Sequence, residues 1–329
     1  MTGPLLHHRA HPVARHSARH VVASQFGAEF DARLRTARPD IEVLSLPRTL
    51  EWPLPPEVNT LLAVPVSAAL RNRDEPSGWP WGLRWVQLIS IGIDNYPAWF
   101  LRRPHVTTAY GVSAQPISDY VLACIQHALR LRERTIQEAA QWRQIPAPTL
   151  AGSTLGLFGF GAIGQALARK ALALGLRVRA LRKSRTPLGI EGVEEAESLQ
   201  DLLAHSDHLV LVAPGTPATR HAINAQTLAQ AKPGLHLVNV SRGSLIDQEA
   251  LRAALDDGRV AFASLDVTEP EPLPDGHWLF QHPKVQLTPH SCANSPQLKD
   301  ALLAKVLRGL EAIDRGELPA DLVDLERGY

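Results

Sequence analysis

The sequence predicts an α/β protein with two domains, and three observations support this. The first is length, because 329 residues exceed what one hydrophobic core usually holds. The second is the alternation of short apolar segments with helical segments from His20 onward. The third is a glycine-rich turn between a predicted strand and a predicted helix, within residues 156–185.

The composition narrows the possible partners. Lys and Arg (34) nearly balance Asp and Glu (33), so we expect no nucleic-acid or membrane partner. Cys124 and Cys292 lie far apart, without the spacing of a metal site or a redox pair, which is typical of a cytoplasmic protein without disulfides. The longest apolar runs are strand-sized, and the start lacks a signal-peptide core. The His-rich residues 1–20 are predicted to be a mobile leader, with a metal site as the alternative.

The first half of the chain is predicted to contain four strands and two helices. The strands are expected at residues 20–26, 41–46, 59–66 and 84–92, with a helix at 27–37 and a Pro- and Trp-rich loop at 73–82. A long amphipathic helix is expected at 115–142. Its apolar stripe consists of Ile117, Val121, Cys124, Ile125, Ala128 and Leu129. Later apolar strands are expected at 208–214, 235–241, 260–267 and 285–290, as in a parallel sheet covered on both faces.

The glycine turn predicts a dinucleotide site. Gly159 permits a tight turn, Gly161 lets the backbone approach a pyrophosphate, and Gly164 allows close packing of helix against strand. The alternative is a turn of the same shape without a ligand. The residues expected to bind the cofactor here are Gly159, Phe160, Gly161, Ala162, Ile163 and Gly164.

The next strand ends in a basic segment, where NAD-binding units usually have an acidic residue. Arg182 cannot accept hydrogen bonds from a ribose hydroxyl, but a cationic, donor-rich segment suits the 2′-phosphate of NADP. We therefore expect NADP(H) to be preferred and NAD(H) to be possible. The alternative is a solvated basic turn. The segment comprises Arg182, Lys183, Ser184 and Arg185.

Three later segments carry a family resemblance. They are "NVSRGSLID" at 239–247, "LDVTEPEPLP" at 265–274 and "LTPHSCANS" at 287–295. In order and spacing, together with "SIGIDN" at 90–95, the chain resembles the D-isomer-specific 2-hydroxyacid dehydrogenases over nearly its whole length. Its basic segment makes it most similar to the NADPH-dependent glyoxylate and hydroxypyruvate reductases.

The resemblance implies three catalytic residues. Arg242 is expected to clamp the substrate carboxylate and polarise the ketone, since a guanidinium binds a carboxylate through two parallel hydrogen bonds. His290 is expected to be the acid/base, because imidazole can donate or accept a proton near neutrality. In the family pattern the catalytic glutamate follows the aspartate of the "DV" step by five residues, which here selects Glu271 after Asp266 rather than Glu269. Glu271 should stabilise the protonated His290. Without the motifs, a surface ion pair and a structural histidine would be the ordinary interpretations of Arg242 and His290.

The resemblance also implies binding residues. Backbone N–H groups of Ser90, Ile91 and Gly92 are expected to bind the substrate carboxylate. Asp266 should lie near the nicotinamide, with capping of a turn as the alternative. Cys292 is interpreted as a packing residue, and the segment after His290 departs from the family's small residue and glycine. The further expected cofactor contacts are Pro214, Val240, Ser241 and His290.

The family fold implies two Rossmann-like or flavodoxin-like domains with a cleft between them, and a doubly wound parallel sheet in the dinucleotide domain. Residues 1–104 and 291–329 would form a discontinuous substrate domain, and residues 105–290 the dinucleotide domain. The apolar stripe from Ile117 is expected to be exposed and to support a homodimer, as in the family. We predict an enzyme that reduces glyoxylate, hydroxypyruvate or a similar 2-oxo acid. The alternatives are a nucleotide-sensing protein like the C-terminal binding co-repressors, and formate or phosphite oxidation.

Overall fold

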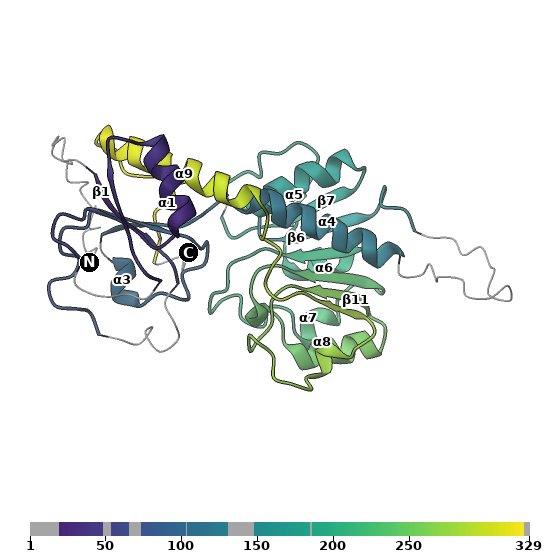
Figure 1. The fold of residues 1–329 in the computed structure, drawn as a ribbon. Helices are drawn as coiled ribbons and strands as arrows, with labels where there is room; N and C mark the ends of the chain where they lie inside the picture. Colours follow the sequence, from purple (N-terminus) through teal and green to yellow (C-terminus); the bar gives the residue numbers. More distant parts are fainter. Residues whose placement is uncertain are drawn as a thin grey trace, which may run out of the picture. The chain divides into compact units, whose positions relative to one another are not determined.

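The computed structural model describes residues 20–48, 54–65, 74–102, 104–130, 148–184 and 186–325. Two compact units are present, unit 1 (Met1–Tyr110 and Lys299–Tyr329) and unit 2 (Gly111–Leu298) (Figure 1). Each contains a parallel sheet with helices against it, which confirms the predicted α/β fold. Residues 1–19 of the predicted leader, the end of the long predicted helix and Arg185 lie outside the described residues.

Unit 1 is built on a five-stranded sheet in the order β2-β1-β3-β4-β5, in which all neighbours are parallel. This is the strand order of flavodoxin-like folds. The strands are β1 Val21–Ser24, β2 Glu42–Ser45, β3 Thr60–Ala63, β4 Trp85–Leu88 and β5 His105–Thr107. The helices are α1 Ala28–Ala37, α3 Ala98–Arg102 and, for all but its first two residues, α9 Gln297–Asp314.

A glycine lets α9 lie directly against β4. A Cβ atom at Gly309 would come within 2.4 Å of the Trp85 ring, which is almost fully buried. The Trp85 indole N–H donates to Thr107 Oγ1 on β5 at 2.8 Å. On α9, buried Lys305 pairs with Asp321 at 2.5 Å. The C-terminal residues thereby complete a core that the N-terminal residues begin.

Unit 2 is built on a seven-stranded parallel sheet in the order β12-β11-β10-β9-β6-β7-β8. The chain runs outward from β6 to β8, returns beside β6 as β9 and continues to β12. In such sheets ligands bind at the carboxyl ends of the strands where the order reverses. The strands are β6 Thr154–Phe158, β7 Arg177–Leu181, β8 Val193–Glu195, β9 His208–Leu211, β10 Leu235–Asn239, β11 Val260–Leu265 and β12 Val285–Leu287.

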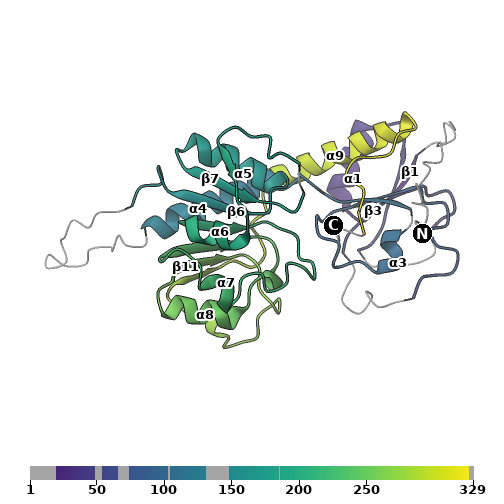
Figure 2. The same cartoon turned by 180° about the vertical axis from the view of Figure 1, so that it is seen from behind.

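Helices cover both faces of this sheet (Figures 1 and 2). Along β9, Val210 packs in the cluster of α4 and α5, whereas Leu209 and Leu211 pack in the cluster of α6, α7 and α8. This alternation follows from the period of two in a strand. The helices are α4 Ala114–Arg130, α5 Ala162–Ala173, α6 Leu199–His205, α7 Ala225–Leu228 and α8 Gln248–Asp256, with short turns η2 Gly243–Leu245 and η3 Trp278–Phe280.

The apolar stripe of α4 faces its own unit. Ile117, Val121 and Ile125 lie in the core with α5, and Cys124 is also buried. The expectation that this stripe is an exposed dimer surface is therefore wrong, because the sheet of the same chain covers it. Within the described ranges, no helix is long and apolar enough to cross a membrane.

Two histidines are buried side by side in this sheet. His208 on β9 and His236 on β10 place their Nδ1 atoms 3.2 Å apart. Burial lowers the pKa of both, that of His208 to about 4. Because one Nδ1 must accept the shared proton, the two rings cannot both be protonated in this arrangement.

Candidate active site

The glycine turn lies at the carboxyl end of β6, beside the end of β9. Gly159 has φ +111°, and a Cβ there would lie 2.6 Å from the Ala213 backbone nitrogen. A Cβ at Gly164 would lie 2.7 Å from the Gly159 carbonyl oxygen. Gly161 precedes α5, whose amino end has no side-chain cap and no acidic residue in its first turn. The turn therefore places the amino end of α5, the positive end of the helix dipole, at the carboxyl edge of the sheet, which suits a dinucleotide phosphate.

The basic segment follows β7, the neighbour of β6. Arg182 Nε donates to Ser184 Oγ at 2.7 Å, and a second guanidinium N–H of Arg182 donates to the same oxygen. Since these bonds use Ser184 as an acceptor, its own hydroxyl proton can be donated; Thr186 Oγ1 lies 3.3 Å away. Lys183 is exposed beside them. The segment thus presents guanidinium, ammonium and hydroxyl donors together.

Asn239, the last residue of β10, holds the loop that carries Arg242. Its side chain is fully buried, donates to the Arg242 carbonyl at 2.8 Å, and accepts from the Ser241 N–H at 3.1 Å. Ser241 Oγ in turn donates to the Ala213 carbonyl at the end of β9. Arg242 is partly exposed, and its guanidinium donates to the Ser241 carbonyl at 2.8 Å. The loop backbone is therefore fixed from within the sheet.

Asp266, which follows β11, holds the turn that carries His290. The residue is 1% exposed, and its carboxylate accepts from Thr288 Oγ1 at 2.5 Å, Ser291 N at 2.9 Å and Cys292 N at 3.1 Å. The Asp266 carbonyl accepts the His290 N–H at 2.8 Å. His290 itself has φ +50°, a left-handed conformation that costs energy for residues other than glycine. These hydrogen bonds compensate for that cost.

His290 points its Nδ1 at a carboxylate. Nδ1 lies 2.6 Å from Glu271 Oε1, and both side chains are nearly half exposed. The other candidate, Glu269, instead pairs with Arg220 at 2.9 Å. With Nδ1–H donated to Glu271, the Nε2 atom of His290 is left for a substrate. The geometry gives the two glutamates different partners.

Gly243 is where the Arg242 loop meets the Glu271 loop. A Cβ at Gly243 would lie 2.0 Å from the carbonyl carbon of Thr268 and 2.5 Å from the Glu269 nitrogen. The two backbones are thus in contact, with only the hydrogen of Gly243 between them. The positions of Arg242 and Glu271 are therefore coupled through the main chain.

Burial raises the pKa of the Cys292 thiol, and the adjacent Asp266 carboxylate raises it further. A protonated buried thiol is a poor nucleophile. This supports the packing role expected for Cys292.

Among the described residues, no group of three or more His, Cys, Asp or Glu side chains is placed to hold a metal ion.

In unit 1, Ser90, Ile91 and Gly92 follow the carboxyl end of β4. Ser90 Oγ donates to the Gly92 carbonyl at 2.8 Å, and the Ser90 carbonyl accepts the Ala109 N–H at 2.9 Å. These bonds give the loop a defined shape.

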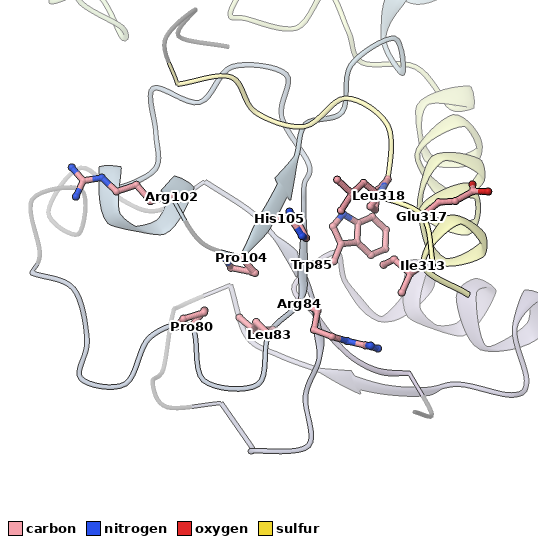
Figure 3. Close-up of a pocket in the computed structure, with 11 residues that line it drawn as sticks. Pro80, Leu83, Arg84, Trp85, Arg102, Pro104, His105, Ile313, Glu317 and Leu318 are labelled. Atoms are coloured by element: carbon pink, nitrogen blue, oxygen red, sulfur yellow. The ribbon is translucent and has the colours of Figure 1, made fainter. Parts of the chain in front are cut away.

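A pocket of about 370 Å³ lies at the opposite, amino ends of β4 and β5 (Figure 3). Its side chains are mostly apolar, and Arg84 and Arg102 at its margins extend in different directions. Arg84 and Arg102 therefore do not converge on one carboxylate in this pocket. We place the candidate active site at the carboxyl ends of the strands of unit 2, where the Arg242 loop and the His290 turn lie.

Comparison with known proteins identifies the family of the chain. The model of the NAD-binding domain of D-isomer-specific 2-hydroxyacid dehydrogenases matches residues 119–292, more than half of the chain. The chain belongs to this family. It is therefore an NAD(P)-dependent oxidoreductase that acts on the CH–OH group of 2-hydroxy acids. The prediction of the family from the sequence is confirmed.

Relatives named as reductases cover most of the chain. Glyoxylate/hydroxypyruvate reductase A of Serratia proteamaculans is 33% identical over 221 residues, which are 66% of this chain and 69% of that protein. Glyoxylate reductase of Korarchaeum cryptofilum is 34% identical over 260 residues, which are 74% and 77% of the two chains.

Two solved structures of the family are similar over nearly the whole chain. The first is a D-isomer-specific 2-hydroxyacid dehydrogenase from Xanthobacter autotrophicus Py2, in complex with NADPH and MES. It has TM-score 0.78 and 30% identity, and the match covers 95% of this chain and 100% of that one. The second is the NADPH-dependent glyoxylate/hydroxypyruvate reductase of Sinorhizobium meliloti, in complex with NADP and sulfate. It has TM-score 0.77 and 26% identity, with 94% and 100% covered.

The structure brings together some of the expected site residues of this family member. His290 contacts Glu271, and Asp266 holds the His290 turn, while Ser90, Ile91 and Gly92 are described separately in unit 1. The individual roles stay predictions. Sequence reasoning missed Tyr120 and Thr288, whose hydroxyls lie 2.7 Å apart beside Asp266. Tyr120 gave no signal, because it reads as one more residue of an amphipathic helix.

Proposed function

We propose that this dehydrogenase uses NADPH to reduce a small 2-oxo acid such as glyoxylate or hydroxypyruvate. The observation that carries the proposal is the 2.6 Å contact between His290 Nδ1 and Glu271. This contact lies at the same edge of the sheet as the Arg242 loop, because the ends of β10 and β11 are joined there: Asp266 N donates to the Asn239 carbonyl at 3.0 Å. The names of the reductase relatives support the choice of substrate.

The cofactor proposal rests on two parts of unit 2. The turn has no room for a Cβ atom at Gly159 or Gly164, and it leads into α5, whose amino end has no side-chain cap, which suits a pyrophosphate. The residues proposed to line the rest of the cofactor site are Phe160, Gly161, Ala162, Ile163, Gly164, Pro214, Val240, Ser241 and Asp266. Arg182, Lys183, Ser184 and Arg185 are proposed to bind the 2′-phosphate. The NADPH and NADP in the two related structures support this preference.

The proposed reduction divides its tasks among three side chains. Arg242 binds the substrate carboxylate and polarises the ketone oxygen. His290 donates the proton on Nε2 to that oxygen, and Glu271 stabilises the ring while it is positive. NADPH, when bound, would supply the hydride. In unit 1, the N–H groups of Ser90, Ile91 and Gly92 are proposed, from the family resemblance, to bind the substrate carboxylate.

The test is loss of reduced-nicotinamide absorbance with glyoxylate, hydroxypyruvate, pyruvate and phenylpyruvate, using NADPH and then NADH. We expect turnover with at least one acid, faster with NADPH. His290→Ala should lower kcat by about 10²- to 10⁴-fold while NADPH still binds. The matched control is His205→Ala, since His205 is also exposed and pairs with a carboxylate, Asp201, at 2.9 Å. No turnover with any acid, or equal effects of the two variants, would contradict the proposal.

We also propose, from the family alone, a homodimer that works in the cytoplasm. The predicted bounds of the dinucleotide domain, residues 105–290, shift at both ends, because β5 (His105–Thr107) pairs with β4 in unit 1 and Cys292 packs in the core of unit 2. We therefore propose unit 2 (Gly111–Leu298) as the dinucleotide domain and unit 1 as the substrate domain. Light scattering during gel filtration measures the assembly, and a monomeric mass would contradict the dimer.

A further inference from the structure

A line of hydroxyl groups joins α4 to the turn that carries His290. Tyr120 on α4 places its hydroxyl 2.7 Å from Thr288 Oγ1. Thr288 Oγ1 donates to Asp266 Oδ1 at 2.5 Å. Asp266 then accepts the N–H groups of Ser291 and Cys292. The line therefore begins on a helix and ends on both sides of the turn, two residues before His290 and two after it.

The direction of each hydrogen bond follows from the number of protons. An ionised carboxylate only accepts, so Thr288 must give its one hydroxyl proton to Asp266. The oxygen of Thr288 can then only accept, and Tyr120 must donate to it. Burial raises the pKa of Tyr120, so this phenol keeps its proton. A hydroxyl that accepts one hydrogen bond becomes a better donor in the next.

This arrangement matters for His290 because its backbone conformation is unfavourable. At φ +50° the residue needs the hydrogen bonds around it, and one of them runs from its own N–H to the Asp266 carbonyl. A carboxylate that shifts would move Thr288, Ser291 and Cys292 together. The Nδ1 of His290 would then leave its position 2.6 Å from Glu271.

We propose that Tyr120 and Thr288 are positioning residues for His290, acting through the Asp266 carboxylate. The inference rests on the proposed function, in which His290 is the proton donor. Neither hydroxyl needs to touch substrate. By donating to Thr288, Tyr120 makes the Thr288 hydroxyl a stronger donor. Thr288 in turn fixes Asp266 Oδ1, the oxygen that also accepts the Ser291 N–H.

The test compares kcat, KM for the 2-oxo acid, the NADPH dissociation constant and the melting temperature in five variants. These are Tyr120→Phe, Thr288→Val, the double variant, Thr288→Ser and the control Ser118→Ala. Ser118 is a buried hydroxyl on the same helix that donates to the Gln115 carbonyl instead. Tyr120→Phe removes one neutral hydrogen bond, and we expect kcat to fall about 3- to 10-fold. Thr288→Val removes a donor to a charged group, and we expect about 10- to 100-fold.

Non-additivity separates a relay from general structural damage. If Tyr120 acts only through Thr288, the double variant should have the kcat of Thr288→Val alone. Thr288→Ser should restore kcat to within about threefold, and Ser118→Ala should keep it within about twofold. KM and NADPH affinity should change less than kcat in every variant. Deuterated NADPH should show a larger isotope effect in Thr288→Val, because the chemical step becomes slower.

The contrary results are equally clear. Wild-type kcat in Tyr120→Phe, additive losses in the double variant, or an equal loss in Ser118→Ala would overturn the inference while leaving the proposed function intact. A wild-type protein that binds NADPH but reduces no 2-oxo acid would overturn the proposed function, and this inference with it.

Discussion

Replacing Gly243 with alanine should disturb catalysis far more than folding. The added Cβ would lie 2.0 Å from the carbonyl carbon and 2.1 Å from the carbonyl oxygen of Thr268. Both are backbone atoms, so no side chain can rotate away. The Arg242 loop and the loop that carries Glu271 must therefore separate.

The size of the effect follows from that distance. Ordinary contact begins near 3.4 Å, so the two backbones must part by roughly 1.4 Å. A misplacement of about 1 Å in catalytic groups can cost about 10²-fold in rate, and we expect kcat to fall by that order. Overpacking of this kind costs about 1–3 kcal/mol in the free energy of unfolding. The melting temperature should drop by several degrees, and the protein should still fold.

The assay measures kcat for reduction of the best 2-oxo acid and thermal unfolding by circular dichroism. Gly258→Ala is the matched control, because Gly258 has φ +81° with nothing within 4 Å of its added Cβ. Its backbone strain should cost about 1–2 kcal/mol without moving either loop. An unchanged kcat in Gly243→Ala, or an equal loss in Gly258→Ala, would refute the coupling of the two loops.

Three further predictions concern charge. Glu271→Gln should lower kcat about 10- to 100-fold. Glu269→Gln, which weakens the pairs with Arg220 and His221 but leaves the His290 contact, should stay within about threefold in the same assay. Arg182→Asp should lose about tenfold to several hundredfold of the preference for NADPH over NADH, measured as the ratio of kcat/KM values. His208 alone should cost up to about 3 kcal/mol of stability as pH drops from about 6.5 towards 4, because the unfolded state protonates it before the folded state does, and buried His236 should add to the loss in the same direction. Melting curves of His208→Gln should show a smaller fall.

The sequence predicts most of the fold because the strands of unit 2 are buried on both faces. Apolar runs of strand length therefore mark β9, β10 and β11 directly. The glycine turn could also be located, since Gly159 and Gly164 have backbone atoms within 3 Å of where a Cβ would lie. Polar residues directly after apolar strands indicated the site, because parallel strands end at one edge.

Periodicity could not predict which surface covers a given stripe. Ile117 and Val121 read as an exposed face, whereas the sheet of the same unit buries them. Pairings between loops were equally hard to predict. The choice of Glu271 over Glu269 needed the spacing seen in the family. Glu269 pairs with Arg220, which lies 49 residues away in the chain, so no local pattern showed that Glu269 has another partner. Tyr120 and Thr288 are separated by 168 residues, and neither has a local pattern that indicates the other.

The two loops of the candidate site are held in the same way, and this explains why polar residues end the strands before them. Asn239 ends β10 and holds the Arg242 loop, while Asp266 follows β11 and holds the His290 turn. Both side chains are buried, so their hydrogen bonds are shielded from water and costly to leave unmade. The Asp266 N–H donates to the Asn239 carbonyl, so the backbone hydrogen bonds between β10 and β11 continue as far as Asn239 and Asp266. The rigid sheet thus sets the positions of Arg242 and His290, although both lie on loops.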